Sequence, residues 1–487
     1  MAEKMRVPAD SAVSAARTGD AWSRHAQAVE ALQESYRAIP RDAPVRLAKR
    51  TSYLFRKRQA AGAPGLDVSR LGRVIDVDPD ARTADVQAMT TYEDLVAATL
   101  AHRLMPAVVP QLKGITLGGA ITGLGIESSS FRNGMPHESV LELEILTGDG
   151  RLITARPGEE TDESSGERPR PDAGHADHSA LFRGFPNSYG TLGYATRLKI
   201  RLEPVRPYVQ LRHLRFARAD RCAEAIAQIC SSRSYEGTSV DFVDGTVFAP
   251  DEMYLTVGTF VDDAPFTSDY TRRKIYYRSL RERSADYLTV HDYLWRWDTD
   301  WFWSSRDLGL ENPLVRALWP RSKLRSDVYR RLIAWDERTA LSARLDRWTR
   351  RPPREDVIQN VEIPLDRIGE YLEFFHREIG ISPVWLCPLR ALRRWPLYPL
   401  DPNQIYIDVG FWSRVQLRAG QSPDHHNRLI EDEIARLGGC KALYSTSYYT
   451  EDEFWRRYNG PAYRPLKDAY DPDGRLHDLY EKCVVGR

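Results

Sequence analysis

The sequence predicts an α+β protein in which a short helical N-terminus is followed by two lobes. Three observations indicate this class. The chain has 487 residues, which allows about three units of roughly 150 residues or two larger lobes. Hydrophobic residues make up 42% and aromatic residues 10%, enough to fill sizeable cores. Segments with strand texture are mixed with helical segments in both halves, which is typical of α+β proteins.

Charge and cysteine content exclude several classes of function. The 69 basic and 68 acidic residues nearly balance, which argues against a nucleic-acid partner. Five cysteines without a CxxC pair disfavour a disulfide framework or a zinc site and favour a reducing cytoplasm. No segment approaches the roughly 18 apolar residues of a membrane span, so we expect no integral membrane segment, while peripheral contact with a membrane stays open. The one HxxH pair, His175 with His178, lies in a charged loop, so no metal site is predicted.

The first lobe is expected over residues 41–205, after an N-terminal helical segment over 1–40. Apolar spacing predicts a helix over 20–40, and Thr91 is expected to cap a helix that runs to about Arg103. The charged run 156–178 is almost devoid of apolar residues and is expected to be a disordered loop. The expected strands are 74–78, 83–88, 107–110, 141–146, 151–154 and 191–202.

The second lobe is expected over residues 206–487, with Pro204 and Pro207 at the boundary. Nine of the 12 tryptophans lie between Trp295 and Trp395, which indicates a bulky aromatic interior or a wide apolar pocket. The expected strands are 208–216, 253–260, 404–409 and 442–448, and the expected helices are 219–231, 327–347, 365–378 and 427–437.

The densest run of glycine, serine and threonine is residues 111–130. Glycines allow the backbone to approach a ligand closely, and hydroxyl groups and exposed amides suit a pyrophosphate or the edge of a flavin ring. An ordinary glycine-rich turn is about as probable on composition alone. The candidate binding residues are Gln111, Leu112, Thr116, Leu117, Gly118, Gly119, Thr122, Gly123, Gly125, Ile126, Glu127, Ser128 and Ser129.

A second stretch of small and hydroxyl-bearing residues covers 185–194. It contains Gly190, Thr191 and Gly193 and enters a predicted strand. Glycines at such positions often mark close approach of a ligand, although a simple turn would look the same. Two such loops about 70 residues apart in one lobe favour one shared ligand.

Residues 45–204 resemble the flavin-binding domain of the vanillyl-alcohol oxidase type, also called the PCMH-type FAD-binding domain. The sequence of 109–130 is similar to the diminuto/seladin group, the delta(24)-sterol reductases. Residues 188–193, 383–388, 404–410, 444–448 and 453–455 are also similar to that group. The resemblance covers about residues 40–485 and implies a two-subdomain FAD-binding domain followed by an α+β substrate, or cap, domain.

The resemblance also implies where FAD binds. The first loop of the flavin domain falls at 46–52, where Arg46, Lys49 and Arg50 stand in place of a glycine-rich loop and could pair with phosphates. The second loop is 111–130, and Gly190, Thr191 and Gly193 are expected near the adenine or ribitol end. The linkage positions for covalent flavin contain no His or Cys, so FAD is expected to be held noncovalently.

The implied reaction is hydride transfer to a carbon–carbon double bond of a sterol or prenyl-derived lipid, with NADPH as a candidate electron donor. Such a reduction also needs an acid near the substrate. The candidates are His291, Tyr444 and Glu127, and each could instead be a packed polar residue. Trp295 and Trp385 are expected to line the substrate pocket. The alternative is an oxidase or dehydrogenase of an alcohol or hydroxy acid, and a homodimer is considered as the assembly.

Overall fold

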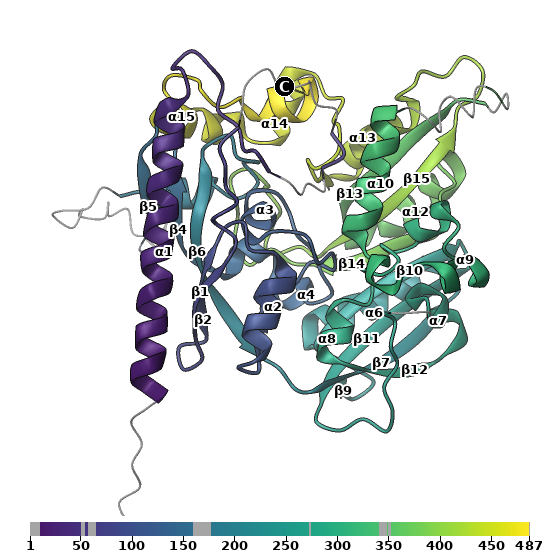
Figure 1. The fold of residues 1–487 in the computed structure, drawn as a ribbon. Coiled ribbons are helices and arrows are strands. Elements are labelled where there is room, and N and C mark those ends of the chain that lie inside the picture. The colour runs from purple at the N-terminus through teal and green to yellow at the C-terminus, as the bar shows by residue number, and fades with distance from the viewer. Residues whose placement is uncertain are drawn as a thin grey trace, which may run out of the picture.

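The computed structural model describes residues 10–49, 54–56, 65–158, 177–271, 274–339, 348 and 352–486. It has two lobes, each built on its own sheet, and the C-terminal segment lies beside the first lobe (Figure 1). The α+β class with two domains is therefore confirmed. The predicted disordered loop over 156–178 falls mostly on 159–176, which lie outside the described residues.

The first lobe contains an antiparallel sheet with helices packed around it. The strand order is β1-β2-β6-β4-β5, and β3 pairs with the C-terminal end of β6. Thr91 caps α2 as predicted, since its hydroxyl accepts from the backbone N–H of Asp94. The elements are α1 (Asp10–Ala38), β1 (Val74–Asp78), β2 (Thr83–Gln87), α2 (Tyr92–Leu100), β3 (Leu104–Pro106), α3 (Leu117–Thr122), α4 (Ser130–Asn133), η1 (Pro136–Ser139), β4 (Val140–Leu146), β5 (Leu152–Ala155), α5 (Ser179–Gly184) and β6 (Tyr194–Pro204).

The second lobe is an eight-stranded sheet with the order β12-β7-β11-β10-β14-β15-β13-β16. Its strands are β7 (Tyr208–Phe216), β10 (Phe242–Ala249), β11 (Glu252–Val261), β12 (Ala285–Thr289), β13 (Arg354–Pro364), β14 (Val384–Leu389), β15 (Tyr406–Gln416) and β16 (Cys440–Lys441), and a small hairpin joins β8 (Ser234–Tyr235) to β9 (Thr238–Ser239). Its helices are α6 (Ala219–Ser232), α7 (Tyr276–Glu282), α8 (Val290–Leu294), η2 (Ser304–Leu308), α9 (Pro313–Leu318), η3 (Arg321–Lys323), α10 (Ser326–Thr339), η4 (Leu365–Arg367), α12 (Ile368–Glu378) and α13 (His425–Leu437).

The two faces of this sheet contact different parts of the protein, because side chains point alternately to either face along a strand. On β13, Val357, Val361 and Ile363 point into an apolar core under α6, α12 and α13. Asn360 lies on the opposite face, which turns toward the first lobe and lines a cavity. The same alternation on β14 sends Trp385 toward that cavity. The second sheet therefore forms one wall of the space between the lobes.

After the second lobe the chain returns to the first. The returning elements are α14 (Glu451–Arg457), α15 (Gly460–Tyr470) and η5 (Glu481–Val485). Lys467 Nζ donates to the carbonyl of Thr191 at 3.0 Å, and the Val45 amide donates to the carbonyl of Arg475 at 2.8 Å. Residues beyond about 450 thus contact the first lobe, although the sequence analysis grouped them with residues 206–450.

Several predicted boundaries differ from the structure. The first helix starts at Asp10 instead of residue 20. The strand expected at 107–110 lies instead at Leu104–Pro106, where it pairs with residues 202–204 of β6. No strand forms over 442–448, since only Cys440 and Lys441 pair with β13. Helix α2 ends at Leu100, ahead of the predicted Arg103.

Candidate functional site

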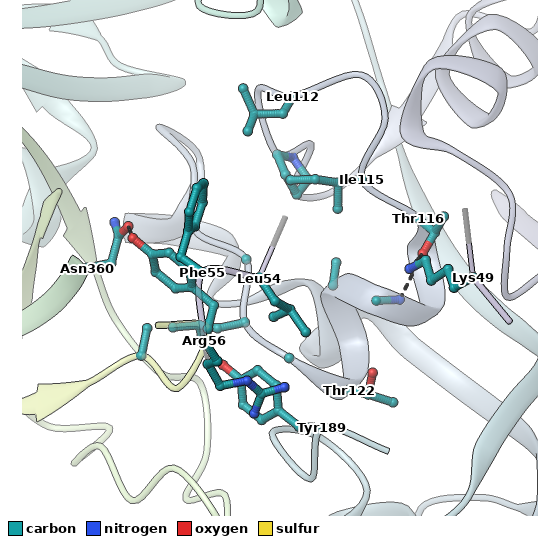
Figure 2. Close-up of a pocket in the computed structure, with 18 of the residues that line it drawn as sticks. Lys49, Leu54, Phe55, Arg56, Leu112, Ile115, Thr116, Thr122, Tyr189 and Asn360 are labelled. Carbon is teal, nitrogen blue, oxygen red and sulfur yellow. Dashed lines mark hydrogen bonds between the residues drawn. The ribbon is translucent and has the colours of Figure 1, made fainter. Parts of the chain in front are cut away.

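A cavity of about 620 Å³ lies between the two lobes and the returning C-terminal segment. Its wall is made of side chains from segments that are far apart in the sequence, as Figure 2 shows for Lys49, Thr116 and Tyr189 of the first lobe and Asn360 on β13 of the second. The predicted cofactor residues that line it are Arg46, Lys49, Gln111, Leu112, Thr116, Gly119, Thr122, Gly123, Gly125 and Ile126. The glycine-rich stretch therefore faces a cavity large enough for a ligand, as expected for a binding loop.

The glycine-rich stretch is shaped by the short helix α3. Thr116 caps the helix by accepting a hydrogen bond from the Gly119 amide, and Lys49 Nζ donates to the Thr116 hydroxyl at 2.8 Å. A Cβ atom at Gly119 would come within 2.9 Å of Thr116 Oγ1 and 3.2 Å of Lys49 Nζ. The absence of a side chain at this position keeps the basic loop and the cap in contact beside the cavity.

The remaining predicted cofactor residues do not line the cavity. Gly118 has a different role, because a Cβ atom there would lie 2.8 Å from Ala88. Ser129 and Thr191 donate their hydroxyl hydrogens to backbone carbonyls of the fold. The full set that lies behind the cavity wall is Leu117, Gly118, Glu127, Ser128, Ser129, Gly190, Thr191 and Gly193. Arg50 lies outside the described residues.

Basic side chains gather around the part of the cavity formed by the first lobe. Arg46, Lys49, Arg56 and Lys482 line it, and Asp408 is the one carboxylate among the described lining residues. Lys482 Nζ donates to the carbonyls of Tyr189 and Gly190, at 3.2 and 3.1 Å. An excess of cations in a concave site favours an anionic ligand such as a pyrophosphate.

The side-chain amide of Gln111 indicates that the cavity binds a polar ligand. The residue is 5% exposed, lines the cavity, and its Nε2 donor has no hydrogen-bond partner among the residues that the structure describes. A buried amide donor without a partner costs free energy unless a ligand satisfies it. Together with the hydroxyls of Thr116 and Thr122 and the cations of the basic loop, this donor set fits the phosphates and polar ring edge of FAD.

The opposite wall, on the second lobe, is aromatic. Trp301, Phe302, Trp385 and Trp412 line the cavity, and the rings of Phe302 and Trp412 stack with centroids 4.4 Å apart. Such a surface suits an apolar substrate or a planar ring. Trp385, which was predicted to line the substrate pocket, lines this cavity. Trp295 is buried but lies outside the cavity, where Lys113 sits 5.7 Å from its ring.

A pair of carboxyl groups in this wall was missed by the sequence analysis. Asp408 on β15 lies directly opposite Glu362 on β13, and both are fully buried. Burial raises the pKa of Asp408 to about 7, and burial together with the neighbouring Asp408 raises the pKa of Glu362 well above its ordinary value. Only Asp408 reaches the cavity. Near neutral pH this pair therefore retains at least one proton beside the aromatic wall.

Polar neighbours hold the carboxyl pair in place. Asn360 Nδ2 donates to Asp408 at 2.6 Å, and Tyr444 donates to Asn360 Oδ1 at 2.9 Å. Trp412 Nε1 donates to the Tyr444 oxygen at 3.2 Å, and the Tyr398 hydroxyl donates to Glu362. Burial raises the pKa of Tyr444 well above 10, so it stays a neutral hydroxyl. The predicted catalytic residue Tyr444 thus lines the cavity one hydrogen bond away from Asn360.

The other two predicted catalytic residues lie elsewhere. The side chain of His291 is 55% exposed at the start of α8, beside Asp292, and is not part of the cavity wall. Glu127 is buried behind the wall and pairs with Arg296 at 3.1 Å. Arg296 also holds Asp244 at 2.9 Å, so Glu127 is part of an ion-pair cluster that joins the lobes. Neither side chain is placed to exchange a proton with a ligand in the cavity.

The comparisons with known proteins agree with this site. The sequence profile described as FAD binding domain matches residues 25–156. The chain is 25% identical over 445 residues to "Delta(24)-sterol reductase homolog dhcr-24" of Caenorhabditis elegans, with 87% of this chain and 80% of that protein covered. It is 25% identical to "Delta(24)-sterol reductase" of Arabidopsis thaliana (87% and 77% covered) and 24% identical to that of Homo sapiens (85% and 77% covered). A weaker match, 28% over 255 residues, is "Cytokinin dehydrogenase 10" of Oryza sativa.

The flavin-type lobe, its cationic cavity and these matches define the chain as an FAD-dependent oxidoreductase with a PCMH-type FAD-binding domain. Within that class it is similar to the delta(24)-sterol reductases over most of its length. The predicted recognition, enzyme class and FAD cofactor are confirmed. No helix in the described part of the chain is long and apolar enough to cross a membrane.

Proposed function

We propose that the protein reduces a carbon–carbon double bond of a sterol or another prenyl-derived lipid. The observation that carries the proposal is the buried pair of facing carboxyl groups, Asp408 and Glu362, of which Asp408 lines the cavity beside the aromatic wall. Alkene reduction needs an acid beside an apolar substrate site, and this wall offers both. The names of the delta(24)-sterol reductases among the relatives support the choice of substrate.

The first lobe binds the cofactor in this proposal. Lys49 and Arg46 attract the phosphates, Gln111 donates to a polar atom, and α3 presents the backbone at Gly119. When bound, FAD supplies the hydride. The second lobe excludes water with aromatic rings and positions the double bond beside Asp408. The Asp408 proton goes to the alkene carbon that does not accept the hydride, and Glu362 shares its proton with the Asp408 carboxylate that remains.

Four finer assignments belong to the same proposal. FAD is held noncovalently, because neither expected linkage position carries His or Cys. NADPH is the electron donor, the protein acts in the cytoplasm or peripherally at a membrane, and a homodimer is its assembly. The first of these rests on residues of this chain. NADPH rests on the resemblance to the sterol reductases, and the location rests on the cysteine content.

An anaerobic half-reaction tests the proposal. The protein is loaded with FAD, reduced with light, and mixed with desmosterol, a Δ24-unsaturated sterol, or with cholesterol, its saturated counterpart. We expect desmosterol to restore the visible absorbance of oxidised flavin and cholesterol to leave it unchanged. If neither sterol acts while alcohols or hydroxy acids reduce oxidised flavin and oxygen reoxidises it rapidly, the protein is an oxidase or dehydrogenase and the proposal is wrong.

A further inference from the structure

Helix α9 has its charged residue inside and its leucines outside. Arg316 is 5% exposed and forms a bidentate ion pair with the buried Asp300. Its two terminal guanidinium nitrogens donate to Asp300 Oδ1 and Oδ2 at 2.6 and 3.0 Å. Leu314 and Leu318 are 76% and 87% exposed. These leucines are four residues apart and share one face of the helix. Because the ion pair fixes the rotation of α9, the structure holds this apolar face outward.

The chain that follows α9 is basic. Trp319 is half-buried and donates its indole N–H to the carbonyl of Lys323 at 3.1 Å. Arg321 and Lys323, in η3, are exposed, and neither forms an ion pair with any residue that the structure describes. Protruding leucines, a tryptophan at their edge and flanking cations are the composition of segments that lie in the interface of a bilayer.

We propose that α9 and η3 attach the protein to the surface of an anionic phospholipid bilayer. Leu314 and Leu318 would enter the acyl boundary, and Arg321 and Lys323 would contact acidic headgroups. A bilayer matches both features, since it offers apolar depth beneath a negative surface. The inference goes beyond the proposed reaction and does not depend on the identity of the substrate.

The attachment site is connected to the wall of the cavity. Asp300, which anchors α9 through Arg316, precedes Trp301 of the aromatic wall. On α10, which follows η3, the Arg330 guanidinium lies 5.0 Å from the ring of Phe55, another lining residue. The proposed attachment site is therefore close, through Asp300 and α10, to residues that line the cavity in which we expect an apolar substrate to bind.

Vesicle sedimentation tests the attachment. The FAD-loaded protein is spun with vesicles of phosphatidylcholine alone or mixed with phosphatidylserine. We expect binding to the anionic vesicles that weakens with added salt. Leu314→Ser combined with Leu318→Ser should weaken it roughly tenfold or more, and Arg321→Gln with Lys323→Gln roughly tenfold. The matched control is Leu152→Ser with Phe266→Ser, which removes two exposed apolar side chains elsewhere and should bind like the wild type.

Three outcomes would overturn the inference. The first is wild-type protein that stays in the supernatant with both kinds of vesicle. The second is a leucine double variant that binds as well as the control variant. The third is a concentration-dependent dimer that the leucine substitutions dissociate without affecting vesicle binding, which would make α9 a contact between two copies. Flavin absorbance and the melting temperature of each variant show whether it is folded.

Discussion

The side-chain amide of Asn360 donates a hydrogen bond of 2.6 Å to Asp408. This bond stabilises the ionised form of Asp408, while burial disfavours it more strongly, so that the pKa of the carboxyl is raised to about 7. The raised pKa favours the protonated form of Asp408, as the proposed role of general acid requires.

The first prediction concerns Asp408 and pH. Since its pKa is raised to about 7, the proton is present below that pH and is lost above it. Anaerobic reoxidation of reduced flavin by the alkene should be constant at acid pH and fall tenfold per pH unit above about 7. Asp408→Asn should lower the rate roughly 10²–10⁴-fold. Glu362→Gln should cost less, because Glu362 does not line the cavity. Equal losses in the two variants would contradict the assigned roles.

Thermal unfolding tests the raised pKa of Asp408 independently of activity. A folded-state pKa above the unfolded value means that the native state loses stability as pH rises through about 7. Asp408→Asn removes the buried charge that appears there. We expect the variant to melt at a higher temperature than the wild type at pH 8, and the difference to shrink at pH 5. A variant that melts lower at pH 8 would show that the ionised carboxylate is stabilising.

The second prediction separates two adjacent glycines. Gly119→Val should weaken FAD binding with little change in melting temperature, because the new side chain meets Lys49 and Thr116 beside the cavity. Gly118→Val should lower the melting temperature as well, because its Cβ atom would lie 2.8 Å from Ala88 within the fold. Gly369→Val is the control, since nothing lies within 4 Å of a Cβ atom there. FAD titration and thermal melts distinguish the three. If Gly119→Val bound FAD with the affinity of the wild type, α3 would not be part of the cofactor site.

The third prediction is that acid precipitation releases FAD into the supernatant. His477, 34% exposed in its side chain and paired with Glu481, is the one histidine among the described lining residues. It lies on the returning segment, outside the two expected linkage loops. Yellow pellets would contradict noncovalent binding. If His477→Ala then released the flavin, this residue would be the attachment point.

The fourth prediction treats Tyr444 as a positioning residue. Tyr444→Phe removes the hydrogen bond that holds Asn360 against Asp408. Losing one such bond corresponds to a decrease in the rate of alkene reduction of roughly tenfold. The pH above which the rate falls should shift, whereas FAD affinity should not. Tyr449→Phe, a buried tyrosine outside the cavity, is the matched control. An unshifted pH profile would place Tyr444 outside the proton pathway.

The fifth prediction concerns substrate affinity. Trp385→Phe reduces the apolar surface of the cavity wall, and KM for the sterol should rise roughly fivefold with kcat nearly unchanged. Trp295→Phe should leave KM alone, because Trp295 lies outside the cavity. If the two variants behave alike, the aromatic wall does not bind the substrate.

Local patterns predicted much of the fold. The strand at Tyr208–Phe216 and the cap at Thr91 follow from alternation and capping chemistry, which neighbouring residues determine. The strand expected at 442–448 failed because strand texture does not supply a pairing partner. The glycine-rich stretch could be singled out because its glycines and hydroxyls lie in one segment, and part of that segment lines the cavity.

The acid could not be found in this way. Asp408 and Glu362 are 46 positions apart and meet only because β15 pairs with β13 in one register. The available signal was a single carboxylate within each otherwise apolar run, 405–411 and 361–365. His291 was predicted as a candidate acid, yet its side chain on α8 is exposed to solvent. Burial, which sets the pKa here, is a property of the tertiary structure.

The contribution of Lys482 to the cavity has a consequence for biosynthesis. Lys482 donates hydrogen bonds to the carbonyls of Tyr189 and Gly190. These two residues are synthesised almost 300 residues before Lys482. The flavin-type lobe can therefore collapse around its sheet during translation while its ligand site is still missing one side. Cofactor retention would then report that synthesis has passed residue 482, and premature termination after α13 would yield a colourless chain even where the first lobe has folded.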